Sequence, residues 1–572
     1  MRLVLALAAT GLLAAFMPWH DVFVPDDEGF ELMKAWLLQR GHPLYAEIWS
    51  DQPPLHTWLL AAAFHLFGPT IAVGRALALA FTALACGSLV TLVARRSGTG
   101  VAALALLGLL LSRTFTRNAT SVTIMLPAIA LALFAVVLIQ PARTRGTLRW
   151  LIAAGAVFGL ALQIKFIAVV LLPLALVELL RPTAPRSAGG PPASPVADTG
   201  SRSAGVSPAS PATAADRLPW AHLAQLIRRL AAWGTGATLG FATVLAFTPA
   251  ATMDMLWTTH LSANTRTVFG PGGALLHGLL RHDADLLLLA AAGLLLALLR
   301  HCRNSVVGEH TRPGCSWMRP RIQPGGAPPH HEPSARPETP PVFREGAENH
   351  TRGGCAPRQI QRVLRDTASS EYLAPFLLLL VAYAGHCWLR PFWAYYYLHL
   401  ALPLAWLVAL ATRDLTNWVA TAQHRRAAVV RFLLVAALFT TVLVRLPERV
   451  TLARDALRLG PPAASAHLLQ TLREHPGEWV FVNQPAIAFQ AGVLVPPEAV
   501  VLSLKRLWLG RFTEDDFLRC LERRRPVVVQ PVMGLPLGPA ARAYLAEHYD
   551  ATSPQPGLGF YLRRPPAANP RP

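Results

Sequence analysis

The sequence predicts a polytopic α-helical membrane protein with a small C-terminal α/β domain. Hydrophobic residues make up 53% of the 572 residues, charged residues only 15%, and the mean hydropathy is +0.37. Apolar runs of about 20 residues, the length that crosses a bilayer, recur along most of the chain. Beyond residue 445 these runs stop, and short β-like and helical patterns alternate. About eleven transmembrane helices are expected from this pattern.

The formal net charge of +20 does not indicate a nucleic-acid-binding protein. Nearly all the cations are arginines in loops between apolar runs, and no nucleic-acid-binding motif accompanies them. Positive loops retained on the cytoplasmic side of a membrane account for the excess. We therefore expect membrane lipids, and no nucleic acid, as partners.

Most spans follow directly from single apolar runs. The first run lacks a convincing signal-peptidase site before His20, so we expect an uncleaved first helix. The runs that match one span are 3–19, 69–93, 99–112, 119–140, 231–249, 284–299, 372–389, 395–412 and 430–445.

The run from Trp150 to Leu180 is too long for one span. A single helix would measure about 46 Å, against a hydrocarbon core of about 30 Å. It would also bring Lys165 to mid-membrane, where a cation costs about 2.5–3.5 kcal/mol. We therefore divide the run at Gln163–Lys165, which moves Lys165 to the outer interface.

Dividing this run also sets the predicted orientation. With about eleven spans the N-terminus lies inside, and the acidic segment 20–68 lies outside. Most arginine-rich loops then face the cytoplasm, and only Arg113 and Arg117 fall on the other side. The loops on the cytoplasmic side contain Arg95, Arg96, Arg143, Arg145, Arg149, Arg228, Arg229, Arg413, Arg425 and Arg426.

The chain is predicted to have two domains. Residues 1–445 form the transmembrane domain, interrupted by cytoplasmic inserts at 183–218 and 301–370. Each insert contains a duplication within Pro- and Gly-rich sequence, which favours disorder. Two His and two Cys in the second insert could bind zinc, but their spacing matches no zinc finger.

Residues 446–572 are predicted to form the extracytoplasmic α/β domain. The patterns predict strands at 479–482, 500–504, 527–530 and 559–562, and helices at 465–474, 514–523 and 539–548. Its function is not apparent from these patterns.

The most informative segment lies just after the first apolar run. Val24–Phe30 brings three consecutive carboxylates, Asp26, Asp27 and Glu28, to the membrane surface, in a chain whose spans contain almost no acid. This position indicates chemistry on a substrate that is partly lipid. The alternative is a solvated acidic loop that only keeps the segment outside.

A second polar segment follows at Trp49–Trp58, where a rigid Pro-Pro turn stands beside Asp51, Gln52 and His56. We expect these three side chains to bind substrate. His56 and His65 lie nine residues apart, and no metal-ligand set closes around them. The sequence therefore predicts no metal site here.

The order of these segments resembles the opening of the GT-C glycosyltransferases, and in particular the bacterial branch related to protein O-mannosyltransferases and lipid A aminoarabinose transferases. Many members carry a lysine before the Pro pair, where this chain has Gln52. The match covers the first 100 residues well and the rest loosely. The matching segments are Pro25–Phe30, Gly41–Tyr45, Asp51–Leu55, Phe67–Gly68, Arg75 and, later, Arg390–Tyr397 running into Leu402–Pro403.

The resemblance implies an enzyme that transfers a sugar, with inversion, from a polyprenyl-phosphate donor to an acceptor hydroxyl. The reaction would take place at the outer face of a bacterial inner membrane, with the active site facing the periplasm. No cofactor is required, although a divalent cation in the acidic loop is compatible with the family. The acceptor is not identified.

An inverting displacement needs a base for the acceptor's proton. Asp27, at the acidic position of the family motif, is our candidate. Glu28 and Asp26 would orient the acceptor or stabilise positive charge on the sugar ring. Mutual repulsion among three adjacent carboxylates should raise the pKa of at least one of them.

The donor phosphate needs cations at the outer interface, and Lys165, Arg266 and Arg390 are predicted there. The alternative for these side chains is snorkelling to lipid headgroups. Tyr396 follows Arg390 at a helix entry, although aromatic residues at this depth also form interfacial belts. In the external loop 250–283, His260 is a further substrate-binding candidate, and the alternative is a loop whose side chains only hydrogen-bond one another.

The main alternative function is a transporter or flippase of lipid-linked sugars. Transporters usually place ionisable groups near the membrane midplane. Here the charged residues gather at the outer boundary, which favours chemistry at the surface. A membrane scaffold would account for the C-terminal domain but leave the acidic segment without a role.

Overall fold

The protein is described by a computed structural model. Three predicted substrate-binding residues, Asp26, Arg266 and Arg390, lie outside the described residues, as do the insert residues 183–218 and 311–370. The described residues are 1–21, 27–145, 147–181, 219–247, 254–264, 277, 280–310, 371–388, 393–458, 463–532, 534–535, 537–552 and 559–565.

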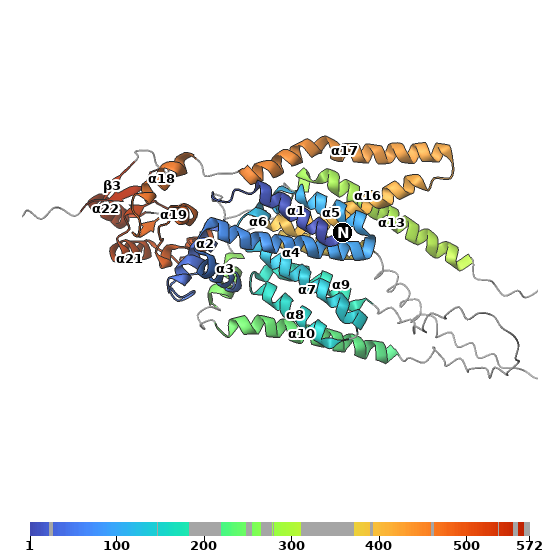
Figure 1. The fold of residues 1–572 in the computed structure, drawn as a ribbon, viewed down its shortest axis with the longest axis horizontal. Coiled ribbons are helices and arrows are strands. Elements are labelled where there is room, and N and C mark those ends of the chain that lie inside the picture. Colours follow the sequence, from blue (N-terminus) through green and yellow to red (C-terminus); the bar gives the residue numbers. More distant parts are fainter. Residues whose placement is uncertain are drawn as a thin grey trace, which may run out of the picture.

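The molecule is an elongated helical bundle with a smaller C-terminal region at one end (Figure 1). Two helices of the acidic segment, α2 (Glu28–Gln39) and α3 (Leu55–Phe67), lie between the two parts. The other helices of the bundle are α1 (Arg2–Phe16), α4 (Ile71–Ser97), α5 (Thr99–Leu110), α6 (Arg113–Thr120), α7 (Met125–Arg145), α8 (Leu148–Leu162), η1 (Phe166–Leu171), α9 (Leu172–Leu180), α10 (Pro219–Leu245), η2 (Asp254–Thr258), α11 (Thr259–Asn264), α13 (Ala284–His310), α15 (Leu373–Trp388), η3 (Ala394–Tyr397), α16 (Leu398–Ala420) and α17 (Arg425–Arg458).

Helix α4 shows how the sequence forms one of the long helices. The Thr70 hydroxyl accepts a hydrogen bond from the Val73 amide at 3.2 Å and caps the N-terminus. Arg95 and Arg96 occupy the last turn, where cations favour the negative end of the helix dipole. Gly98 then adopts a φ of +89° and ends the helix. The apolar residues between these ends pack into the core of the bundle.

Within the described residues, four helices are long and apolar enough to cross a membrane by length and composition. A fifth is counted if α5 and α6, which are bent by 81° at their junction, form one span. Five further apolar helices are shorter, so the count of eleven stays a prediction. The four segments are Ile71–Ser97, Met125–Ala142, Ala394–Ala420 and Arg425–Leu457.

The predicted break in the run 150–180 is present in the structure. Helix α8 ends at Leu162, and the chain resumes at Phe166. The Gln163 carbonyl accepts the Leu55 amide at 3.1 Å, and the Gln163 side-chain amide donates to the Phe241 carbonyl at 2.8 Å. These bonds hold the break against the start of α3 and bring Lys165 to the end of the bundle that carries the acidic segment.

Three boundaries differ from the prediction. Between the runs 99–112 and 119–140 the chain forms the short helix α6, capped by Ser112, whose hydroxyl accepts the Phe115 amide at 3.5 Å. Helix α13 continues to His310, into the predicted second insert. Helix α17 continues past the predicted domain boundary at residue 445 to Arg458, with Pro447 inside it.

Two of the arginines predicted to face the cytoplasm, Arg96 and Arg413, lie near the C-terminal end of α4, away from the acidic segment, where Ser97 and Arg413 bind the same Glu371 carboxylate. Arg96 pairs with the buried carboxylate of Glu178. Arg413 pairs with Glu371 at 2.6 Å. Both arginines are therefore held by carboxylates, at the end of the bundle that the sequence pattern assigns to the cytoplasm.

The C-terminal region contains a four-stranded sheet in the order β1-β2-β4-β3. Strands β1 and β2 are parallel, and β4 is antiparallel to both β2 and β3. Its elements are α18 (Ala463–Arg473), β1 (Val480–Phe481), α19 (Pro485–Ala491), η4 (Pro497–Ala499), α20 (Leu504–Trp508), α21 (Glu514–Arg524), β2 (Val528–Val529), α22 (Pro539–His548), β3 (Tyr549–Ala551) and β4 (Tyr561–Arg563).

The prediction of a strand at 500–504 was wrong. The segment follows η4, and the Ser503 hydroxyl accepts the Arg506 amide at 3.3 Å and caps α20. Val500 and Val501 are buried, which explains their β-like pattern, but they belong to the segment that connects η4 to α20 and not to the sheet. Strand β3 was missed because it follows α22 without an intervening turn residue.

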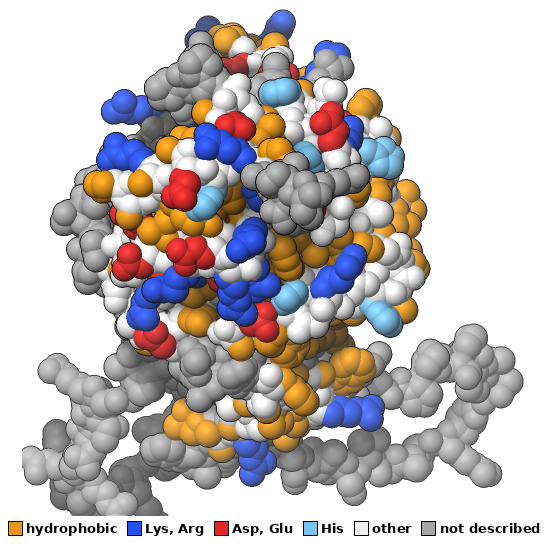
Figure 2. All heavy atoms as spheres, turned by 90° about the vertical axis from the view of Figure 1, so that its left-hand side faces the viewer, with side chains coloured by type: hydrophobic (Ala, Val, Ile, Leu, Met, Phe, Trp, Pro, Cys, Tyr) orange, Lys and Arg blue, Asp and Glu red, His pale blue; other side chains and the backbone are white. Residues whose placement is uncertain are grey.

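The C-terminal region packs directly on the acidic segment, and the two share one hydrophobic core. The Phe489 ring of α19 lies 5.4 Å from the Trp36 ring and 5.6 Å from the Phe64 ring. Gly29 faces Ala486 so closely that an added Cβ would lie 2.3 Å from the Ala486 amide nitrogen. Figure 2 shows the outer face of this end of the molecule, where acidic and basic side chains are intermixed with hydrophobic ones.

Candidate functional site

Glu28, the predicted second catalytic carboxylate, forms a buried ion pair. Arg75 donates from Nε and Nη2 to the two carboxylate oxygens, at 3.1 and 3.0 Å, and neither side chain is exposed. The Val122 amide also donates to Glu28, at 3.0 Å. This contact joins the start of α2 to α4 and to the segment after α6. The catalytic role of Glu28 stays a prediction. Its contacts with Arg75 and Val122 give it a structural role.

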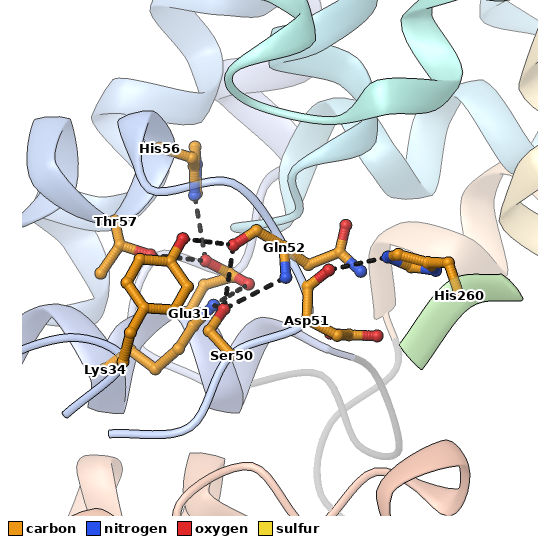
Figure 3. A network of polar contacts seen from close by, with 9 residues as sticks. Glu31, Lys34, Ser50, Asp51, Gln52, His56, Thr57 and His260 are labelled. Atoms are coloured by element: carbon orange, nitrogen blue, oxygen red, sulfur yellow. Dashed lines mark hydrogen bonds and ion pairs between the residues drawn. The ribbon is translucent and has the colours of Figure 1, made fainter. Parts of the chain in front are cut away.

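One turn later, Glu31 forms a second buried polar network (Figure 3). Its carboxylate accepts from Lys34 Nζ at 2.8 Å and contacts His56 Nδ1 at 3.3 Å and the Thr57 hydroxyl at 3.5 Å. Burial opposes ionisation, but Lys34 and His56 outweigh it and lower the pKa of Glu31 to about 2. The predicted substrate-binding residue His56 is thus held against α2.

The Pro-Pro turn is held in place by hydrogen bonds around Gln52 (Figure 3). Tyr45 adopts a φ of 72°, unusual for a bulky residue, and its hydroxyl donates to the Gln52 carbonyl at 2.7 Å. The Ser50 hydroxyl donates to the same carbonyl at 3.2 Å. Lys34 Nζ lies 3.5 Å from the Ser50 hydroxyl, which connects this turn to the Glu31 network. The backbone of Asp51 is therefore oriented by its neighbours on both sides.

Asp51 meets side chains from two distant parts of the chain. His260 Nε2 lies 2.7 Å from the Asp51 carbonyl oxygen, and Lys505 Nζ lies 3.7 Å from the Asp51 carboxylate. Lys505 Nζ also lies 3.3 Å from His260 Nδ1. An ammonium can only donate, so Nδ1 accepts, and Nε2 carries the proton that it donates to Asp51. The contacts describe a neutral imidazole between a carbonyl and a lysine.

The ionisation of these groups follows from burial and charge. Burial, together with the Lys505 charge, lowers the pKa of His260 below its ordinary value. Burial would raise the pKa of Asp51, but Lys505 and His260 outweigh it and lower that pKa. Burial would lower the pKa of Lys505, but Tyr396, Asp51 and Asp27 outweigh it and raise that pKa. Near neutral pH the site therefore contains an ionised Asp51 and a charged Lys505.

Lys165 completes this arrangement from the break between α8 and η1. Its Nζ lies 4.6 Å from the centre of the Tyr395 ring and 5.4 Å from that of Tyr396, both within cation–π range. The side chain is buried, and burial lowers the pKa of Lys165 to about 8, against the opposing attraction of Asp27. Lys165 therefore still carries a charge near neutral pH, with two aromatic faces beside it.

Asp27 lies directly before α2, as its N-cap residue, and is only partly buried. Its charge opposes the lowering of the Lys165 pKa by burial and contributes to the raised pKa of Lys505. We call the group formed by Asp27, Asp51, Lys165, His260, Tyr395, Tyr396 and Lys505 the lysine–aspartate cluster.

A buried histidine pair supports the cluster from within the bundle. The His386 ring stacks on the Tyr396 ring, with centroids 5.4 Å apart and planes 11° apart. His386 Nε2 also lies 3.1 Å from His399 Nδ1. These contacts hold the Tyr396 ring against Lys165.

The structure brings together five of the predicted site residues, Asp27, Asp51, Lys165, His260 and Tyr396, and Gln52 stands directly beside them. Glu28 and His56 instead belong to the two buried networks of α2. Lys505 was missed, and so were Tyr395 and Lys34. Lys505 could have been noticed as one of only three lysines in an arginine-rich chain.

The cluster has the charges that a group transfer involving phosphate needs. A partly exposed carboxylate can accept a proton, and two buried ammonium groups can hold an anion. Among the described residues, no group of three or more His, Cys, Asp and Glu side chains could hold a metal ion.

Comparison with known proteins connects this geometry to a family. Residues 51–188, which include Asp51 and Lys165, match the family model of the dolichyl-phosphate-mannose-protein mannosyltransferases. No curated protein sequence matches the chain.

The fold is similar to that of ArnT from Cupriavidus metallidurans. The ArnT structure bound to undecaprenyl phosphate has a TM-score of 0.52 at 12% identity, over 99% of each chain. The apo structure has a TM-score of 0.51 at 13% identity, over 98% of this chain and 97% of that one. The predicted resemblance is confirmed: this chain shares its fold with ArnT, and its residues 51–188 match the model of the mannosyltransferase family.

Proposed function

We propose that this chain transfers a sugar from a polyprenyl-phosphate donor to an acceptor hydroxyl, with inversion at the anomeric carbon. The observation that supports this function most directly is the lysine–aspartate cluster, in which a carboxylate and two lysines meet at one end of a membrane-type bundle. The family match over 51–188 and the ArnT-like fold support the same class of reaction.

In the proposed reaction Asp27 acts as the general base. The acceptor oxygen forms a bond to the anomeric carbon and gives its proton to the Asp27 carboxylate, while the bond from that carbon to the phosphate oxygen breaks. The polyprenyl phosphate leaves with the bonding electron pair. Lys165, which contacts both the Tyr395 and Tyr396 rings, would stabilise the negative charge on the leaving phosphate.

We further propose that the chain lies in a bacterial inner membrane with the cluster facing the periplasm. The arginine contacts of Arg96 and Arg413 lie at the opposite end of the bundle, which the positive-inside rule assigns to the cytoplasm. A polyprenyl tail would then lie in the outer leaflet, with its phosphate level with the cluster.

The test is an assay of the purified chain in lipid with a panel of polyprenyl-phosphate sugars. An enzyme should consume at least one donor and release polyprenyl phosphate, and Asp27→Asn should lower consumption by about 10²–10⁴-fold. A flippase of lipid-linked sugars would move the donor across vesicle membranes and leave it intact. Consumption of no donor, with such movement, would contradict the proposed function.

A further inference from the structure

The C-terminal region contributes a charged side chain to the middle of the cluster. Lys505, on α20, is 7% exposed, and its Nζ lies 3.3 Å from His260 Nδ1 and 3.7 Å from the Asp51 carboxylate. A buried ammonium is costly unless its surroundings compensate the charge. The residue at this contact between two parts of the molecule is nevertheless a lysine, although an apolar residue could fill the same space.

The turn around Asp51, residues 50–54, contains no lysine or arginine. The Gln52 side chain is neutral and hydrogen-bonds to the Asp51 carboxylate. Lys34 is engaged by Glu31 at 2.8 Å. Lys34 acts on Asp51 only as the last of several charges, whereas Lys505 is the first, and both Lys165 and Lys505 are acted on by Asp27 as well as by Asp51.

Lys505 also has the donor capacity to bind an anion. An ammonium has three N–H donors. Within the described residues, its polar contacts are with His260 and, at the longer distance, with Asp51. The neutral His260 accepts one donor and holds Nζ in place without cancelling its charge.

We propose that Lys505 is a phosphate-binding residue of the transferase site, so that the C-terminal region completes the site by supplying its second cation. This inference rests on the proposed function, because it assigns a role toward the donor's phosphate. Lys165 would approach that phosphate from the bundle and Lys505 from the C-terminal region. The packing of α19 on α2 through Gly29 fixes how closely the two approach.

The test measures binding of undecaprenyl phosphate, and of undecaprenol as the phosphate-free control, to the full chain in lipid nanodiscs. Lys505→Gln keeps donors for His260 and Asp51 but removes the charge, and should weaken undecaprenyl phosphate binding by about tenfold. Lys505→Arg keeps the charge and should stay within about threefold of the wild type. Undecaprenol should bind all variants equally.

Arg511→Gln is the matched control. Arg511 joins the same region to Asp254 at 3.0 Å, and both side chains are about half exposed, outside the cluster. This variant should bind undecaprenyl phosphate within about twofold of the wild type, since exposed ion pairs contribute little. Thermal unfolding of each variant checks that the region remains folded.

The outcomes separate the two proposals. Wild-type affinity for undecaprenyl phosphate in Lys505→Gln would overturn the role of Lys505 and leave the proposed function standing. Equal losses of undecaprenyl phosphate affinity in Lys505→Gln and Arg511→Gln would show that the packing of the C-terminal region on the bundle matters, and not the charge of Lys505. This result would also overturn the role of Lys505. If the wild-type chain bound undecaprenyl phosphate and undecaprenol equally well, both the role of Lys505 and the proposed function would be overturned.

Discussion

Asp27 and Glu28 are neighbours in the sequence but lie in opposite surroundings. Glu28 is fully buried against Arg75, and its carboxylate binds a guanidinium and a backbone amide. Asp27 stands just outside α2, partly exposed, and its charge acts on Lys165 and Lys505. Successive positions at a helix start point in directions about 100° apart, so a single residue step separates the two environments.

This difference separates two uses of a carboxylate. A buried carboxylate with a bidentate arginine holds elements together but has little access to a substrate proton. A carboxylate at the edge of a cluster of mixed charge remains accessible and can accept a proton. The three acids of the motif therefore need not share one role, and variants of each should fail in different ways.

The largest effect is expected for Asp27→Asn. Loss of a general base should lower sugar transfer by about 10²–10⁴-fold, whereas binding of undecaprenyl phosphate and thermal stability should stay close to wild type. Turnover and binding in lipid nanodiscs measure the two quantities. Asp550→Asn, which removes an exposed ion pair with Arg564, is the control and should leave turnover unchanged. Full activity of Asp27→Asn would remove this residue as the base.

Arg75→Met should act on stability instead. It leaves Glu28 buried without its guanidinium partner, which costs about 3–5 kcal/mol. Thermal unfolding in detergent should therefore shift strongly downward. The double variant Glu28→Gln with Arg75→Met keeps an acceptor for the Val122 amide and removes the charge, and should recover part of the loss. A stable but inactive single variant would instead place Glu28 among the catalytic groups.

The Glu31 network predicts a pH dependence of stability. The pKa of Glu31 is about 2 in the folded chain, below its ordinary value of 4.5, so its stabilising contribution is present above pH 4.5 and is lost as the pH falls toward 2. Its size is on the order of 3 kcal/mol. The stability difference between wild type and Glu31→Gln should therefore be constant from pH 7 to 5 and shrink below pH 4.5.

Thermal unfolding across this pH range measures that difference. Glu47→Gln changes a more exposed carboxylate, which contacts His42 at 2.8 Å, and should follow the wild-type curve. A difference that already shrinks between pH 7 and 5 would contradict the assigned network.

A smaller effect is expected for Gly29→Ala, which tests the packing that joins the two regions. The added methyl group would meet the backbone of Ala486, and relieving the clash should cost about 1–3 kcal/mol and move the C-terminal region away from α2. Sugar transfer should fall as well, because Lys505 moves together with the C-terminal region. At Gly100, in the first turn of α5, an added Cβ would meet nothing within 4 Å. Gly100→Ala should therefore leave the stability unchanged or raise it. Equal stability of the two variants would exclude the packing account.

Local patterns were enough to predict much of the fold. Apolar length and the cost of a mid-membrane lysine predicted the break at Gln163–Lys165, and the structure has it. The hydropathy runs anticipated the long helices, since a membrane span shows its length and composition directly in the chain. The strand at 500–504 failed because a short buried run has the same pattern in a strand and in a segment between helices.

The amino-acid order was sufficient for the bilayer-spanning pattern, the acidic motif and its family resemblance, because each is a property of one continuous segment. Three sets of contacts are seen only in the folded chain. Glu28 pairs with Arg75, and His56 contacts Glu31. Lys505 contacts Asp51 and His260. These contacts join segments far apart in sequence, and no periodicity records which distant charges meet. Packing of α19 on α2 brings the C-terminal lysine to the two aspartates, and the charge balance of the site follows from it.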